Sequence, residues 1–215
     1  MKAFGALAAL LLLGAAAPAT KGPSLSCTGS LSPSEAAICA DPELAAWDRA
    51  VAKIYRASVK TSDITPSDQR QWLSRRDECQ ADRACLLREY RDWPGFGVTA
   101  AGVGTVFERT DTGRRDPASL TILPIHGDWY YFSLIALHQQ TDDPGSTNDG
   151  IYSGVIRLER GIGTYDEGPE EYSCRFRLER EGSGWGISSF GEDTKCGGLN
   201  VFVDGSYRPV RRARR

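Results

Sequence analysis

The positions of the cysteines constrain the fold of this 215-residue chain more than any other feature. There are six, four in the first half and two near the end: Cys27, Cys39, Cys79, Cys85, Cys174 and Cys196. An even number of cysteines in an exported chain predicts disulfides formed in an oxidising compartment. We expect two bridges within the first group, where the spacing leaves the pairing open, and a third between Cys174 and Cys196.

Zinc ligation is the alternative role for these cysteines. Zinc sites favour C-x2-C pairs or nearby histidines, and the cysteines here have neither. His126 and His138 stand apart from each other, and we interpret both as ordinary strand residues. The sequence therefore predicts no metal site.

The first 19 residues have the pattern of a secretory signal peptide. Lys2 precedes an apolar run over residues 4–13, and small residues then end in Ala17-Pro18-Ala19. The run is shorter than the ~20 apolar residues that span a bilayer, and a buried N-terminal helix is the alternative. Cys27 lies too far behind the run for lipid attachment. We expect cleavage after Ala19 and a periplasmic or secreted protein without a membrane anchor.

Capping signals mark three helix starts within residues 27–93: Ser32-Pro33-Ser34-Glu35, Asp41-Pro42-Glu43 and Thr65-Pro66-Ser67-Asp68. One apolar stripe at helical spacing follows the second signal: Leu44, Trp47, Val51, Ile54 and Tyr55. A further short helix carries Leu86 and Tyr90 and ends at Trp93-Pro94. About 65 residues with two bridges can form an independent helical hairpin.

The helix that follows Thr65 carries a group of large and charged side chains: Gln69, Trp72, Arg76 and Asp77. Most of this group shares one helical face. Arg76 lies one turn after Trp72, so its guanidinium can rest near the indole and still reach an acidic partner. The group contains neither a nucleophile with a base nor a set of metal ligands. We interpret it as a structural face.

The helix that follows Thr65 resembles part of a known family when it is taken together with the residues before it, which are Cys27, the run Ser34–Leu44, Asp48 and Tyr55. The family is the LprI-type lysozyme-inhibitor N-terminal domain. That family is a small, cysteine-containing helical module of bacterial envelope proteins. The resemblance covers residues 27–93, about a third of the chain. It implies that the protein inhibits lysozyme by binding to it. We recognise no family for the remainder.

The composition changes after residues 94–103, a Gly-rich stretch that we interpret as a linker. Seven short runs rich in β-branched and aromatic residues then follow: 104–109, 119–125, 129–139, 151–159, 172–180, 184–190 and 199–203. Tight-turn residues separate the runs, and apolar and charged residues alternate along 172–180. We therefore expect an α+β chain. A small disulfide-stapled helical hairpin domain would precede an antiparallel β meander or barrel over residues 104–207.

No catalytic motif is present in the sequence. It lacks a G-x-S-x-G elbow, an H-E-x-x-H pair and a Gly-rich loop that ends in Lys-Ser/Thr. A glycosidase-like carboxylate pair is compatible with the many acidic residues, but nothing points to one. We predict a protein that is not an enzyme and that needs no cofactor.

The charge distribution indicates more about a possible partner than the search for catalytic motifs does. The chain carries −2, the loss of Lys2 with the leader would give −3, and the body without the five arginines of residues 208–215 carries −8. Acidic residues gather in the predicted loops of the β domain: Asp142, Asp143, Asp149, Asp166, Glu167, Glu170 and Glu171. Acidic loops on a rigid scaffold can steer and hold a basic partner such as a lysozyme. The alternative is that they only keep an exported protein soluble.

Residues 208–215 form a basic tail that we expect to be solvated, with contact to an anionic surface such as lipid headgroups or nucleic acid as the alternative. We predict a protein partner and no nucleic acid. Two functional classes follow: an inhibitor of a peptidoglycan-cleaving lysozyme, or an envelope binding module that inhibits nothing.

Overall fold

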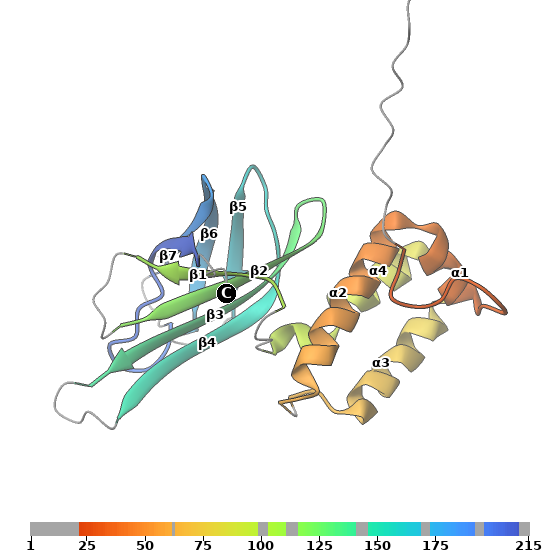
Figure 1. Ribbon diagram of the computed structural model, residues 1–215, viewed down its shortest axis with the longest axis horizontal. Coiled ribbons are helices and arrows are strands. Elements are labelled where there is room, and N and C mark those ends of the chain that lie inside the picture. The colour runs from red at the N-terminus through yellow and green to blue at the C-terminus, as the bar shows by residue number, and fades with distance from the viewer. Residues whose placement is uncertain are drawn as a thin grey trace, which may run out of the picture.

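The computed structural model describes residues 22–61, 63–98, 103–110, 116–140, 146–168, 173–191 and 196–210. Figure 1 shows a helical part followed by a strongly curved antiparallel sheet, an α+β fold as expected. The helices are α1 (Pro33–Ala40), α2 (Pro42–Ser58), α3 (Pro66–Glu78), α4 (Arg83–Arg91) and the 3-10 turn η1 (Pro94–Gly97). The strands are β1 (Thr105–Arg109), β2 (Ala118–His126), β3 (Trp129–Gln139), β4 (Thr147–Arg157), β5 (Ile162–Asp166), β6 (Arg175–Glu181), β7 (Gly184–Ser189) and β8 (Gly205–Pro209). The expected leader (1–19) and the end of the basic tail (211–215) lie outside the described residues.

The helices begin where the sequence places caps. Ser32 and Glu35 form a reciprocal capping box at α1, and Thr65 and Asp68 form a second at α3. Asp41 ends α1, and its carboxylate accepts hydrogen bonds from the first N–H groups of α2. These local bonds confirm the three helix starts that the capping signals predict.

Two disulfides staple the helical part. Cys27 pairs with Cys39, and Cys79 pairs with Cys85, which settles the pairing that the spacing left open. The helices enclose a shared core that is rich in large side chains: Ile38, Leu44, Trp47, Ile54, Trp72, Leu86, Tyr90 and Trp93. The predicted apolar stripe of α2 therefore forms one wall of this core.

The eight strands follow the order β4-β3-β2-β1-β8-β7-β6-β5, all antiparallel. Two four-stranded meanders thus join where β1 pairs with β8. The edge strands β4 and β5 curl toward each other, since Gly163 packs against Ile156 and the ring of Tyr165 lies 6.0 Å from that of Tyr152. The result is the nearly closed barrel that the run of short strands predicts, filled by apolar side chains from both meanders.

Two strand assignments from the sequence are wrong. β5 was not expected, because its five residues include Gly163 and the charged Asp166 and carry a weak strand pattern. The run 199–203 was expected to be a strand but is a loop, and the last strand is β8. The alternation that suggested a strand is real, since Val201 and Val203 are buried while Phe202 is exposed. β8 also includes Arg208 and Pro209, which the sequence assigned to the tail.

The helical part packs on the outer face of the barrel. Trp47 of α2 meets Trp129 of β3 edge to face at 5.6 Å, and the hydroxyl of Tyr131 donates to the carbonyl of Val98 at 2.6 Å. Phe96, in the stretch expected to be a linker, is buried against Trp93 and Tyr131. The independence of the two domains stays a prediction. The helical core extends onto the outer face of the barrel at this contact, through Ile125, Trp129 and Tyr131, and is separate from the core inside the barrel.

Candidate functional site

The antiparallel register brings several strand ends together on one end of the barrel. They are the start of β4, the end of β5, the start of β6, the end of β7 and the start of β8. We call this region the loop end. The helical part contacts the barrel toward its opposite end, through residues such as Ile125, Trp129 and Val155. The loop end is therefore left uncovered by the helices.

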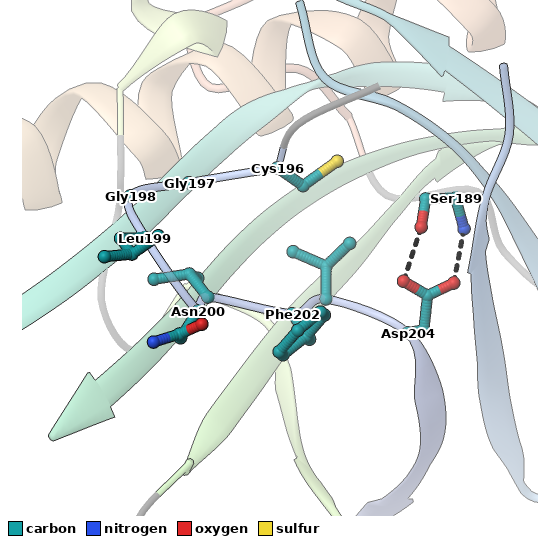
Figure 2. A pocket seen from close by; sticks show the side chains of 10 residues that line it. Ser189, Cys196, Gly197, Gly198, Leu199, Asn200, Phe202 and Asp204 are labelled. Carbon is teal, nitrogen blue, oxygen red and sulfur yellow. Dashed lines mark hydrogen bonds between the residues drawn. The ribbon is translucent and has the colours of Figure 1, made fainter. Parts of the chain in front are cut away.

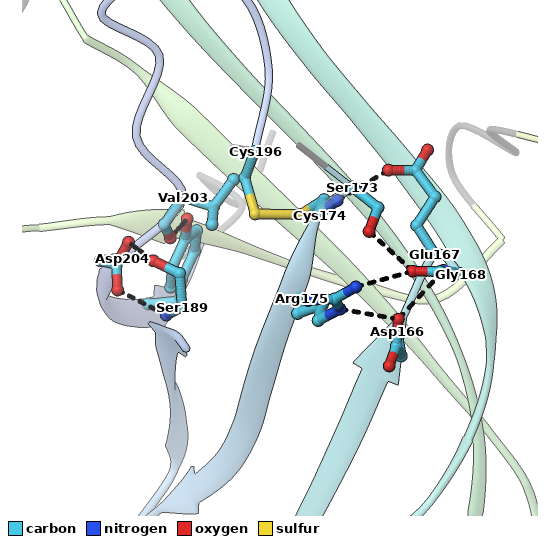
Figure 3. The surroundings of a disulfide bond; sticks show 11 residues. Asp166, Glu167, Gly168, Ser173, Cys174, Arg175, Ser189, Cys196, Val203 and Asp204 are labelled. Atoms are coloured by element: carbon cyan, nitrogen blue, oxygen red, sulfur yellow. Dashed lines mark hydrogen bonds and ion pairs between the residues drawn. A yellow bond between two sulfur atoms is a disulfide. The ribbon is translucent and has the colours of Figure 1, made fainter. Parts of the chain in front are cut away.

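A buried disulfide, Cys174–Cys196, ties two loops of the loop end together, as the sequence predicted (Figure 3). One loop follows β5. There the Cys174 N–H donates to the Glu167 carboxylate at 2.8 Å, and the Glu167 N–H donates back to the Cys174 carbonyl at 3.1 Å. The Asp166 carboxylate accepts from the Gly168 N–H at 3.0 Å and pairs with Arg175 at 3.2 Å. These contacts, the Gly168 N–H first, lower the pKa of Asp166.

The second loop, Cys196–Asp204, leads into β8 and surrounds a groove of about 510 Å³ (Figure 2). Its backbone is held from three sides. The buried guanidinium of Arg109 donates to the carbonyls of Phe202 and Asp204. The Asp204 carboxylate accepts from the backbone N–H of Ser189 at 2.6 Å and from its hydroxyl.

The third support comes from β4. The Asn148 side chain donates to the Leu199 carbonyl at 2.7 Å, and the Gly198 N–H donates to the Asp149 carbonyl at 2.9 Å. Gly197 adopts φ +107°, and a Cβ there would lie 2.6 Å from Val201, so this position requires glycine. The loop is thus a fixed surface although it belongs to no strand.

Leu199 and Phe202 are the two most exposed large apolar side chains in the described part of the chain, at 75% and 62%. Both line the groove (Figure 2). Val201 and Val203, which alternate with them, are buried in the barrel core. The loop therefore turns one apolar set inward to anchor itself and leaves a second set open to solvent.

Tyr152 connects the two loops beneath this surface. Burial, followed by the nearby Glu167 carboxylate, raises its pKa to about 12. The backbone of Gly197 lies near the same phenol and acts in the opposite direction, to lower this pKa. Its ring packs against Phe176 and Tyr165 of the barrel core. Tyr152 thus lies next to the loop that follows β5, the Cys196–Asp204 loop and the barrel core.

The structure places three of the seven predicted acidic residues, Asp149, Asp166 and Glu167, at the loop end. All three residues are exposed. Asp166 and Glu167 in addition accept the hydrogen bonds that shape their loop. Asp142, Asp143, Glu170 and Glu171 lie outside the described residues. Sequence reasoning missed Leu199 and Phe202 because their run was assigned to a strand. The glycines that bracket the run, after Cys196 and after Asp204, were the available signal for a loop.

A smaller groove of about 340 Å³ lies between α2 and α3 and includes Trp72 and Arg76. The charged groups beneath it are paired. The buried Asp48 accepts from Tyr90 at 3.1 Å and twice from Ser24 at 2.6 Å. Arg76 lies over Trp72 at 5.7 Å and bonds Asp77 through two nitrogens, as the spacing predicted. This network fits a structural role.

The pKa values in this network follow from the same contacts. Burial, followed by the Asp48 carboxylate, raises the pKa of Tyr90 well above its usual range. Burial acts to lower the pKa of Arg76, but Tyr90 and Asp77 outweigh it and the pKa rises. Both groups therefore keep one protonation state through the physiological range.

Within the described ranges, no group of three His, Cys, Asp or Glu side chains is arranged to hold a metal ion. His138 pairs with Asp116 at 2.6 Å on the barrel. None of the helices in that part of the chain has the length and apolar character that crossing a bilayer requires. Comparison with protein-family models, with curated proteins and with solved structures finds no match to this chain.

Proposed function

We propose that the protein is an exported binding protein that inhibits a basic lysozyme and that the loop end is its contact surface. The observation that carries the proposal is the groove of the Cys196–Asp204 loop, which is open, apolar and rigidly held at the same end of the barrel as the exposed residue Asp149. Protein interfaces typically combine an apolar centre with a polar or charged rim. The resemblance of residues 27–93 to the LprI-type module supports a lysozyme as the partner.

Charge supports the same conclusion. The body of the protein carries −8 when the leader and the tail are left out. A net negative body attracts a basic protein over distances of about one Debye length, ~8 Å at physiological salt. Carboxylates at the loop end would orient the partner toward the groove during this approach.

A non-inhibitory binding module is the second candidate. The observation that favours it is the groove volume of about 510 Å³, which lies within the range of small-ligand pockets. Such a module would bind an envelope ligand at the same loop end without blocking any enzyme.

A turbidity assay separates the two candidates. Cell-wall lysis by c-, g- and i-type lysozymes is followed with and without the purified mature protein at micromolar concentration. The proposal predicts slower lysis by at least one class, with weaker inhibition at higher salt. Unchanged lysis by all three classes would contradict the inhibitor function and leave the binding module.

A further inference from the structure

One face of α2 carries a row of positive side chains. They lie three or four residues apart and are Arg49, Lys53, Arg56 and Lys60. An α-helix turns about 100° and rises about 1.5 Å per residue, so the row occupies an arc of about 60° over a length of about 16 Å. Lys60 lies in the turn that continues the helix, because Val59 keeps helical backbone angles. We call these four residues the α2 row.

The α2 row differs from neighbouring cations because acidic side chains leave it unpaired. Arg83 of α4, by contrast, reaches both Asp41 and Glu43 at 2.6 Å. Asp63, which follows the row in the sequence, accepts from the hydroxyl of Thr61. The three lysines and arginines of the row after its first member are exposed and form no ion pair with the described part of the chain. The row is therefore open to an anion from outside the chain.

Local structure explains only part of the row. The negative end of a helix attracts cations within its last turn, and this accounts for Arg56. Arg49 and Lys53 lie earlier in α2, where that attraction has faded. Asp48, next to Arg49 in the sequence, is buried and its carboxylate accepts from Tyr90. A row that continues over more than two turns therefore suggests a partner that is itself extended.

The side chains around the row define the kind of anion. Along α2, all of which the structure describes, no large apolar or aromatic side chain shares the arc of the row. Trp47 and Tyr55 lie on the other side of the helix. Helices that bind membranes insert Trp, Phe or Leu, and single-stranded nucleic acids stack their bases on aromatic rings. Cations in single file without such residues suit a polar, linear chain of anions.

We propose that the α2 row binds a linear anionic glycan that carries a carboxylate or phosphodiester group on each repeat. The glycan lies along α2 and its anions meet successive cations of the row. The inference goes beyond the proposed function, because it assigns a second partner to a second surface. The helical part contacts the barrel away from the loop end. At physiological salt a charge acts over about 8 Å, so the acidic loop end does not set the affinity of the row.

The test measures the fluorescence anisotropy of a labelled oligogalacturonate, which carries a carboxylate on every sugar, as the intact mature protein is added. The expected result is binding that weakens as the salt concentration rises. Each cation beside an anionic surface contributes about fivefold in affinity, so Lys53→Gln/Arg56→Gln/Lys60→Gln should bind at least about tenfold more weakly. If this variant loses its native circular dichroism, Lys53→Gln alone serves, with a loss of about fivefold.

The matched control removes three exposed cations from α3, α4 and β4: Arg70→Gln/Arg88→Gln/Arg157→Gln. It changes the net charge by the same amount and should bind like the parent. The inference is overturned if the parent does not bind the oligogalacturonate at low salt, or if both variants lose affinity equally. Phosphatidylglycerol vesicles and single-stranded DNA are titrated in parallel. Tighter binding to either of them that depends on the α2 row would reject a glycan as its ligand.

Discussion

Arg109 at the end of β1 donates a hydrogen bond to the carbonyl of Phe202, 93 residues later in the chain. The same guanidinium reaches the carbonyls of Asp204 and Asp116. One buried cation therefore joins the first strand of the barrel to the loop that carries the exposed apolar side chains. The surface that we propose for binding depends on this contact for its shape.

Replacing Arg109 by methionine should lower stability and loosen the loop. Each buried carbonyl left without a donor costs about 1–3 kcal/mol. Urea denaturation measures the loss, and amide hydrogen exchange over residues 196–204 should become faster. Arg177→Met is the control, because Arg177 is exposed and lies over the ring of Phe190 in a cation–π pair at 5.4 Å. Equal stability of Arg109→Met and the control would contradict the role of Arg109.

The phenol of Tyr152 should lose its proton at a higher pH than an ordinary tyrosine does. Its pKa is raised from 10.0 to about 12, so the folded state favours the neutral phenol more than the unfolded state does. This contribution to stability is complete below pH 10.0 and is lost as the pH rises through about 12. Absorbance at 295 nm, compared between the parent and Tyr152→Phe, measures the titration. If the variant loses a transition near pH 10 instead, Tyr152 is not buried beside Glu167 as described.

Trp72→Ala should destabilise the helical part by about 3–5 kcal/mol. Trp72 packs against Tyr90 and Trp93, and its indole N–H donates to the carbonyl of Glu89 at 3.0 Å. Thermal unfolding measures the effect, and Trp72→Phe should lose less. A Trp72→Ala protein that is as stable as the parent but binds more weakly would show that this face is an interface.

The packing of the helical core on the outer face of the barrel predicts mutual stabilisation of the two parts. A fragment that ends at Val98 loses the contact of Trp47 with Trp129 and that of Phe96 with Tyr131. Its urea midpoint should therefore lie below that of the helical part in the intact chain, and adding the barrel fragment should restore part of the difference. Identical midpoints with and without the barrel would mean that the interface contributes nothing.

Local signals predicted much of the helical part and of the barrel. The caps at Ser32, Asp41 and Thr65 act within one helical turn, so the sequence contains them completely. The alternation of Cys174, Phe176 and Leu178 with charged residues likewise requires only that one face of β6 be buried, as all three are. The segregation of the cysteines was sufficient to predict the Cys174–Cys196 bridge.

The rest depends on contacts between distant residues. The run 199–203 has the alternation of a strand, but Arg109 and Asn148 take its carbonyls and hold it as a loop. Both partners lie far from the run in the sequence, so the local pattern does not predict these hydrogen bonds. The packing of Trp129 against Trp47 is equally remote, because it joins the start of β3 to α2. Acidic residues could be placed in loops, but not the apolar groove beside them.

The central claim is that the loop end is the surface that stops a basic lysozyme. Its most direct test is the inhibition constant of the mature protein and of Asp149→Asn/Leu199→Ser/Phe202→Ser against the lysozyme class that the parent inhibits. Glu159→Gln/Val59→Ser/Ile162→Ser, changed away from the loop end, is the matched control. We predict that the loop-end variant loses at least about tenfold in inhibition while the control inhibits like the parent. Equal inhibition by both variants, or no inhibition by the parent of any lysozyme class at micromolar concentration, would contradict the claim.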